Sequence, residues 1–158
     1  MGFDSRALRN AFGRFATGVC VVTASSEQSG PMGMTINSFS SVSLDPPLVM
    51  WNLQSNSECF ELFTTAKQFA INILADDQIE HSRRYSRKGE HGLRPDDYRI
   101  GSNGAPVLRG ALATFECDLW RNYDGGDHLL LVGRVKALHN RPTGKPLLFF
   151  SGAYRELR

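Results

Sequence analysis

The chain has 158 residues, of which 41% are hydrophobic and 22% charged, and its 18 Lys and Arg against 16 Asp and Glu give a net charge of +2. These values are typical of one globular domain and argue against a nucleic-acid binder, which usually carries a basic patch. No apolar stretch is long enough to span a bilayer, and the N-terminal residues lack the apolar segment of a signal peptide. The three cysteines are not closely spaced, so we expect free thiols and a cytoplasmic location.

Hydrophobic periodicity divides the chain into short segments, most of them typical of strands. The predicted elements, in chain order, are a helix over 5–16, a strand over 19–23, a turn over 25–30, an extended segment over 32–44, a strand over 48–51, a short helix through 60–63, a strand over 68–74, a helix over 76–85, a long loop over 86–106, a strand over 108–121, a turn over 124–127, a strand over 128–138 and a last strand over 147–150. Asp4 or Ser5 caps the first helix, and Ser55 with Glu58 has the spacing of a capping box ahead of the second. The extended segment needs a β-bulge near 40–41 to bring its apolar residues to one face.

This order of elements predicts a mainly β fold with a few peripheral helices. The strands are joined mostly by turns, and no regular alternation of strand and helix suggests a doubly wound parallel sheet. We therefore expect a single domain over 1–158, built on an antiparallel sheet that is closed on itself or nearly so.

The common catalytic motifs are absent from the sequence. There is no Gly-rich dinucleotide loop, no Walker-type phosphate loop and no hydrolase nucleophile elbow. The four histidines lack metal-ligand spacing, so we expect no metal site. Each cysteine is expected to be a small core residue rather than a nucleophile.

The most informative segment is the uncharged stretch 33–41, which is rich in hydroxyl and amide side chains. Thr35, Asn37 and Ser38 suit hydrogen bonding to a flat ring with polar edges and to a phosphate. The polar residues 55–57, at the start of a predicted helix, offer a second place for an anion. The alternative is that these hydroxyls bond only to the protein's own backbone.

Two further segments are candidates for a site. The sequence at 125–128 carries a histidine at a predicted hairpin tip, where a plain turn with an exposed His128 is the alternative. Arg83, Arg84, Arg87 and Lys88 form a basic cluster that suits a phosphate, or else an ordinary solvated helix face.

Several motifs, in order along almost the whole chain from about 5 to 156, resemble the short-chain flavin reductases. The matching blocks are FATGVCVVT at 15–23, GMTINSFSSVSLDPPLV at 33–49, FAINIL at 69–74, GDH at 126–128 and PLLFFSGAY at 146–154. The resemblance implies a homodimeric FMN-binding split β-barrel that reduces FMN or FAD with NADH or NADPH and supplies reduced flavin to a partner monooxygenase. The choice within each pair of cofactors stays open.

The resemblance also implies a set of site residues. The flavin ring and ribityl chain are expected at Met32, Gly33, Met34, Thr35, Asn37 and Ser38. Ring and phosphate contacts are expected at Asn52, Leu53, Gln54, Ser57 and Phe60, with Arg84 as the basic residue at the phosphate. His128 is expected to position the nicotinamide, together with Tyr154. Ile36 departs from the family pattern, since many relatives carry a smaller residue there.

Three other functions remain open at this level. A flavin storage or delivery protein would share the same wall but would not oxidise NADH. A split-barrel oxidase for a pyridoxal-type substrate would need a second basic pocket for the substrate phosphate. A barrel that serves only protein interaction would bind no flavin.

Overall fold

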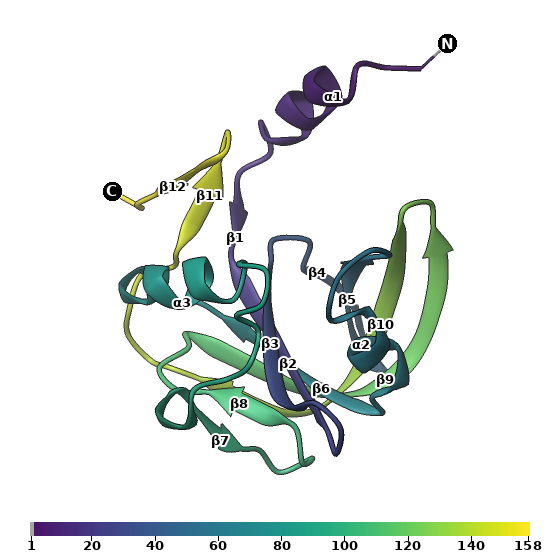
Figure 1. Ribbon diagram of the computed structural model, residues 1–158. Helices are drawn as coiled ribbons and strands as arrows, with labels where there is room; N and C mark the ends of the chain where they lie inside the picture. Colours follow the sequence, from purple (N-terminus) through teal and green to yellow (C-terminus); the bar gives the residue numbers. More distant parts are fainter. Residues whose placement is uncertain (1) are drawn as a thin grey trace.

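The computed structural model describes residues 2–158, and its architecture is an antiparallel split barrel with few helices (Figure 1). The helices are α1 (Ser5–Phe12), α2 (Phe60–Thr65) and α3 (Ile79–Arg84), with 3₁₀ turns at Asp76–Gln78 and Pro95–Asp97. The strands are β1 (Thr17–Gly18), β2 (Cys20–Ser26), β3 (Gly30–Ile36), β4 (Ser40–Leu44), β5 (Pro47–Gln54), β6 (Gln68–Ile73), β7 (Tyr98–Ile100), β8 (Pro106–Leu108), β9 (Ala113–Gly125), β10 (His128–Asn140), β11 (Leu148–Phe150) and β12 (Ala153–Arg155).

The main sheet has seven strands in the order β3–β2–β6–β9–β10–β5–β4. Its two edge strands, β3 and β4, follow each other in the chain and are joined by residues 37–39. The barrel is therefore split at the place where the polar stretch 33–41 crosses from one edge of the sheet to the other. Two small sheets, β1–β11–β12 and β7–β8, complete the strand pairing.

The core is formed by the inward faces of the main sheet and by α2. Trp51 is fully buried and packs edge-on against Phe63 and Phe69, with ring centroids 5.0 and 6.1 Å away. Val22 and Ile71 belong to the same cluster and are also fully buried. Period-2 alternation places these β-branched and aromatic side chains on one face of their strands, which is why the sequence pattern located them.

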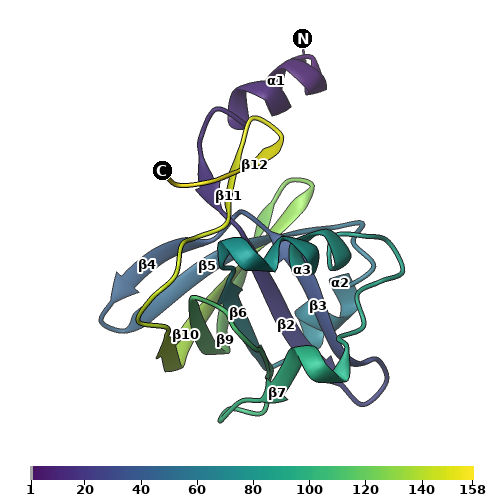
Figure 2. The same ribbon diagram turned by 90° about the vertical axis from the view of Figure 1, so that its left-hand side faces the viewer.

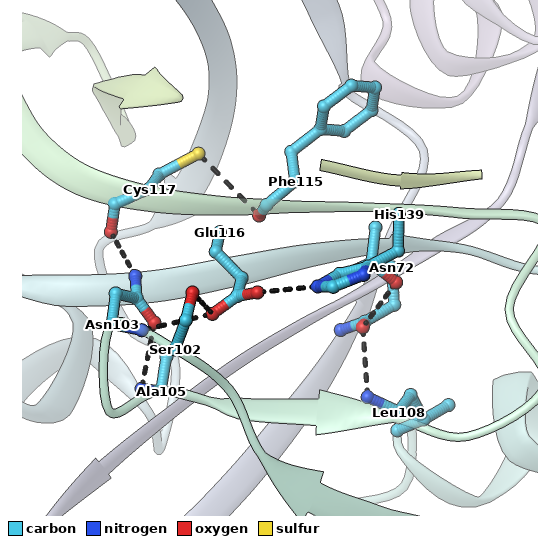
Figure 3. A network of polar contacts seen from close by, with 10 residues as sticks. Asn72, Ser102, Asn103, Ala105, Leu108, Phe115, Glu116, Cys117 and His139 are labelled. Carbon is cyan, nitrogen blue, oxygen red and sulfur yellow. Dashed lines mark hydrogen bonds and ion pairs between the residues drawn. The ribbon is translucent and has the colours of Figure 1, made fainter. Parts of the chain in front are cut away.

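A buried amide fixes β8 against the main sheet. Asn72 is fully buried, and its Nδ2 donates to the carbonyl of Val21 at 2.9 Å. Its Oδ1 accepts from the backbone N–H of Leu108 at 2.9 Å and from Thr114 Oγ1 at 3.2 Å. A buried amide costs stability unless it is hydrogen-bonded, and here its partners come from three segments that it thereby holds together. Figure 3 shows the bond between Asn72 and Leu108.

The antiparallel β prediction is confirmed, and so are most strands and the hairpin turn, where Gly126 has the positive φ of 76° that the turn needs. The bulge also exists, with the register shift between Ser41 and Ser43. The segment 32–44 is, however, two strands on opposite edges. The loop 86–106 contains β7, residue 108 belongs to β8, and β12 was not predicted.

The predicted capping box is wrong. Helix α2 begins at Phe60, and its N-cap Cys59 makes no side-chain capping bond. Glu58 instead accepts a 2.8 Å hydrogen bond from the backbone N–H of Gly89, which is 31 residues away. A tertiary partner therefore replaces the local one that the spacing suggested.

The first helix is shorter than predicted and buries none of its residues. Phe12 and Phe15 are 69% and 79% exposed, so the apolar face predicted for 5–16 has no partner within residues 2–158. Figures 1 and 2 both show α1 beyond β1, away from the main sheet and beside the β11–β12 hairpin. None of the described helices is long and apolar enough to cross a membrane.

Candidate functional site

A groove of about 570 Å³ opens at the split of the barrel. The groove is formed by the end of β3 with the crossing 37–39, the end of β5, the turn 55–58 ahead of α2, residues 86–91, and His128 at the start of β10. Its lining residues are Met34, Thr35, Ile36, Asn37, Ser38, Asn52, Gln54, Asn56, Ser57, Glu58, Ser86, Lys88, His91 and His128. Amides and hydroxyls dominate this list, as the sequence predicted for a site that receives a polar-edged ring.

The hydroxyl groups of the groove bond mainly to the protein itself. Thr35 Oγ1 donates to the carbonyl of Ser82 at 2.7 Å, and Ser38 Oγ accepts from the backbone N–H of Asn52 at 2.9 Å. Ser57 Oγ accepts from the backbone N–H of Cys59 at 3.1 Å. These internal hydrogen bonds hold the groove together.

The amide groups are the ones left for a ligand. Across residues 2–158, the side chains of Asn37, Gln54 and Asn56 make no hydrogen bond. Asn52 Oδ1 is buried and has no partner either. An unpaired buried acceptor costs about 1–3 kcal/mol, so a ligand with an N–H donor at its edge would bind here favourably. The isoalloxazine ring of a flavin carries such an N–H between two carbonyl groups, and the groove fits it on this ground.

His128 lies at one end of the groove. It is paired across the strands with Gln54, which brings both side chains to the same rim. Its Nδ1 is 2.6 Å from Asp127 Oδ1, so Nδ1 carries the proton and donates to the carboxylate. This contact orients the imidazole and leaves Nε2 as its second polar atom.

Residues 86–91 form a wall on the other side of the groove and are joined to β3 by several hydrogen bonds. The backbone N–H of Gly33 donates to the carbonyl of His91 at 2.8 Å, and His91 Nδ1 donates to the carbonyl of Gly33 at 3.0 Å. His91 Nε2 is 3.3 Å from Glu58 Oε2, which ties the wall to the start of α2. The wall presents Lys88 and Ser86 to the groove.

The structure brings together most of the residues predicted for the site. Of these, Met34, Thr35, Asn37, Ser38, Asn52, Gln54, Ser57 and His128 line the groove, and Met32, Gly33, Leu53, Phe60, Arg84 and Tyr154 do not. The side chain of Leu53 is fully buried, and Met32 and Phe60 pack against the same core. These residues contribute to the groove through packing and backbone.

Gly33 has a packing role. A Cβ there would lie 2.9 Å from Leu93 Cδ2 and 3.0 Å from Val21 Cγ1, closer than side chains normally approach. The absence of a side chain lets the segment carrying His91 pack directly on β3.

Arg84 and Tyr154 lie on the other side of the wall. Arg84 lines a second, smaller cavity, and the Tyr154 hydroxyl is 2.6 Å from Ser82 Oγ, with Arg83 above its ring. Neither residue lines the groove, so the contacts of Arg84 with the flavin phosphate and of Tyr154 with the nicotinamide stay predictions.

Glu58, Ser86 and His91 line the groove but were not predicted to do so. Local spacing assigned Glu58 to a capping box, and the other two lie in a segment without periodicity. Asn56 and Lys88 line the groove and were candidates for an anion or phosphate site in the sequence, whereas Ile36 was noted only as a departure from the family pattern. A buried histidine in a Gly-rich loop was the one local signal for this wall.

The histidines and cysteines of the described part can be placed relative to the groove and the core. Residues 2–158 contain no cluster of three or more His, Cys, Asp or Glu that suits a metal ion. Burial raises the pKa of Cys20 and of Cys117 to about 12, and that of Cys59 to about 11. All three cysteines are buried, as predicted for core residues, and a raised pKa makes a thiol a weaker nucleophile.

The split barrel and its amide-lined groove define a class of protein that binds a flat, polar-edged ligand at the rim of a β-barrel. Comparison with known proteins identifies that class: the sequence model of the flavin reductase like domain matches residues 12–158, and the chain belongs to this family.

Individual relatives agree with this assignment. The chain is 46% identical, over 97% of its length and 86% of the relative's, to "FMN reductase (NADH) SmoA" of Agrobacterium fabrum. It is 33% identical, over 96% of its length and 81% of the relative's, to "Flavin-dependent monooxygenase, reductase subunit HsaB" of Mycobacterium tuberculosis. Among solved structures, the NADH:FAD oxidoreductase SgcE6 of Streptomyces globisporus, in complex with NAD and FAD fragments, has a TM-score of 0.92 and 35% identity. The match covers 100% of this chain and 97% of that one.

Proposed function

We propose that this protein is an NAD(P)H-dependent flavin reductase that supplies reduced flavin to a partner monooxygenase. The observation that carries the proposal is the groove at the barrel split, with unpaired amides along its wall and an oriented histidine at its rim. The names of SmoA, SgcE6 and HsaB support the reaction and the monooxygenase partner.

The flavin ring would be held by the amides near the crossing from β3 to β4. Asn52 Oδ1 supplies the acceptor for the ring N–H, and Asn37 and Gln54 supply further polar contacts. Ile36 is buried beside them and offers an apolar surface to the ring. Because these groups are uncharged, they fit a ring that is neutral when it enters.

The flavin phosphate would lie at the other end of the groove. Lys88 is the single Lys or Arg among the lining residues, and Ser86 and Ser57 face the same space. Glu58 brings a negative charge there, but its carboxylate is engaged by the N–H of Gly89 and by His91. Lys88 therefore remains available to bind a phosphate.

Bound flavin and nicotinamide carry out the hydride transfer, and the protein supplies position and electrostatics. His128 positions the nicotinamide: Asp127 holds the proton on Nδ1, so the ring keeps one orientation at the open rim. No side chain has to change its protonation state for the transfer. Both NADH and NADPH are candidate donors, and NADH appears in the names of SmoA and SgcE6. FMN and FAD are both candidate acceptors.

We also infer that the protein works as a homodimer. Phe3, Leu8, Phe12 and Phe15 are exposed by 86%, 38%, 69% and 79% on or beside a helix that has no partner within the described chain. An amphipathic helix of eight residues is not stable in water without packing. A second copy of the chain would cover this face.

The experiment that tests the function is steady-state oxidation of NADH and NADPH by the purified protein with FMN, FAD and riboflavin. Asn52→Ala is the diagnostic variant, and Asn122→Ala, an exposed amide on β9, is the matched control. We expect the KM for flavin to rise about tenfold in the first variant, as loss of one buried hydrogen bond implies, and not in the second.

The same assay separates the other functions. Flavin binding without NADH oxidation would indicate a storage protein and would refute the reductase proposal. A protein that binds no flavin, with no change in melting temperature when FMN is added, would indicate an interaction barrel.

A further inference from the structure

The wall 86–91 is fixed to β3 at both of its ends. At one end, the carbonyl of Tyr85 accepts a 3.1 Å hydrogen bond from the backbone N–H of Thr35. At the other end, the carbonyl of His91 accepts a 2.8 Å hydrogen bond from the backbone N–H of Gly33. Tyr85 and His91 are buried, whereas the residues that directly follow Tyr85 are exposed. The middle of the wall is therefore held less firmly by β3 than its two ends.

Glu58, from the turn ahead of α2, supports the middle of the wall. Its Oε2 accepts a 2.8 Å hydrogen bond from the backbone N–H of Gly89 and lies 3.3 Å from His91 Nε2. The next residue, Cys59, is fully buried, so the carboxylate projects from a fixed point of the chain. A hydrogen bond to an ionised acceptor is stronger than one between neutral groups. Glu58 thus ties an exposed turn to a rigid part of the barrel.

The orientation of the wall decides which of its charges faces the flavin groove. Lys88 lines the groove, whereas Arg87 and Glu90 line a smaller cavity behind the wall and lie 3.4 Å apart. Lys88 itself forms no ion pair with any residue of the described chain. Gly89, the residue held by Glu58, follows Lys88 directly. The bond to Glu58 therefore fixes the backbone beside the one cation that the wall presents to the groove.

We propose that Glu58 is a positioning residue for flavin binding: its carboxylate holds the wall in the orientation in which Lys88 reaches the flavin phosphate. The inference rests on the proposed function, in which Lys88 binds that phosphate. Glu58 acting only as a charge would have the opposite effect, because a carboxylate and a phosphate repel each other. Loss of the carboxylate should therefore weaken phosphate binding if Glu58 positions Lys88, and strengthen it if Glu58 acts by charge alone.

The test measures the dissociation constants of the full chain for FMN and for riboflavin by flavin fluorescence. Their ratio isolates the phosphate, because riboflavin has the same ring and ribityl chain without it. We expect the preference for FMN to fall about fivefold in Glu58→Ala and in Lys88→Gln. The double variant should lose no more of it than Lys88→Gln alone, because both changes remove the same contact.

Two further variants are controls for the loss of charge. Glu58→Gln keeps an oxygen that accepts from Gly89, so it should retain most of the preference for FMN. Glu61→Ala removes an exposed carboxylate from the first turn of α2 and should retain all of it. Action by charge alone would instead make Glu58→Gln and Glu58→Ala alike.

Trypsin gives a second readout that needs no flavin. It cleaves after Lys88, at an exposed position of the wall, and mass spectrometry identifies the product. We expect cleavage there to be at least about threefold faster in Glu58→Ala than in wild type, with no change in Glu61→Ala, because a turn that has lost its anchor opens more often.

An unchanged or raised preference for FMN in Glu58→Ala would overturn the proposal. So would unchanged cleavage after Lys88, a double variant that loses more than Lys88→Gln, or a wild-type chain that binds riboflavin as tightly as FMN. None of these results would refute the reductase function, provided that the wild-type chain binds flavin and oxidises NADH. A wild-type chain that binds neither flavin would refute both proposals.

Discussion

The buried carboxylate of Glu116 holds the loop 101–105 in place, so removing its charge should destabilise the fold. The side chain is fully buried on β9. Oε2 accepts a 2.7 Å hydrogen bond from His139 Nε2, and Oε1 accepts 3.1 Å bonds from Ser102 Oγ and from the backbone N–H of Asn103 (Figure 3). A Cβ at Gly101 would overlap the carboxylate, so the loop packs directly on it.

Glu116→Gln keeps the volume and removes the charge. The new amide can still accept from the loop, but its NH₂ group then faces His139 and cannot accept from it. Hydrogen bonds to a charged group contribute about 1.5–3 kcal/mol each, and a mispaired buried group costs about 1–3 kcal/mol. We therefore expect the free energy of unfolding to fall by about 3 kcal/mol, which lowers the melting temperature of a chain of this length by roughly 6–12 °C.

The assay is urea unfolding followed by tryptophan fluorescence, since Trp51 is fully buried. The control is Glu27→Gln, at an exposed position in the turn between β2 and β3, where we expect no change. All samples have the same protein concentration, because association would add to stability. A variant at Glu116 that unfolds within about 0.5 kcal/mol of wild type would refute this account of the network.

The pH dependence gives a second check. Burial alone would raise the pKa of Glu116, but the hydrogen bonds from His139, Asn103 and Ser102 outweigh it and hold the pKa below its ordinary value of 4.5. A lowered pKa means that the carboxylate stabilises the fold above pH 4.5 and that this contribution is lost as the pH falls through the folded-state value. The difference between wild type and Glu116→Gln should therefore shrink on acidification. If the difference in the free energy of unfolding between the two proteins stays constant down to the acid transition, the lowered pKa of Glu116 is contradicted.

Three more variants test the groove and helix α1. Asp127→Ala frees the imidazole ring, so the KM for NADH should rise by about three- to tenfold with an unchanged KM for flavin, whereas Asp124→Ala should change neither in the same kinetic assay. Phe12→Ser removes apolar surface from the exposed face of α1 and should shift the protein from dimer to monomer in light scattering; a variant that stays dimeric would exclude this face as the interface. Gly33→Ala places a methyl group against Leu93 and should cost about 1–3 kcal/mol in thermal unfolding while weakening flavin binding; unchanged affinity would separate the wall from the groove.

Local pattern was enough to predict the β framework of this protein. The alternation of apolar residues on β5 and on the first half of β9 is a direct consequence of side chains pointing to opposite faces of a strand, so one buried face can be recognised without neighbours. The stretch around Asn37 could also be recognised from the sequence as a candidate site, because a run of uncharged amide side chains is unfavourable in an edge strand. Family motifs added the split-barrel fold, which is confirmed, and the prediction that this stretch binds a flavin.

The contacts between distant segments depended on the tertiary structure. Glu58 has a good local interpretation as a helix cap, but the N–H of Gly89 and the ring of His91 compete for the same carboxylate and are 31 and 33 residues away. Arg84 stands in a run of basic residues that gives no orientation, and helical geometry turns it to the far side of the wall. The apolar face of α1 predicts a partner, but periodicity along one chain carries no information about which surface covers it. The sequence alone determined which residues favour strands and which have side chains suited to binding a ligand, because these properties depend on each residue and its nearest neighbours. Only the fold decided which of them share a cavity, because that depends on which strands become the two edges of the sheet.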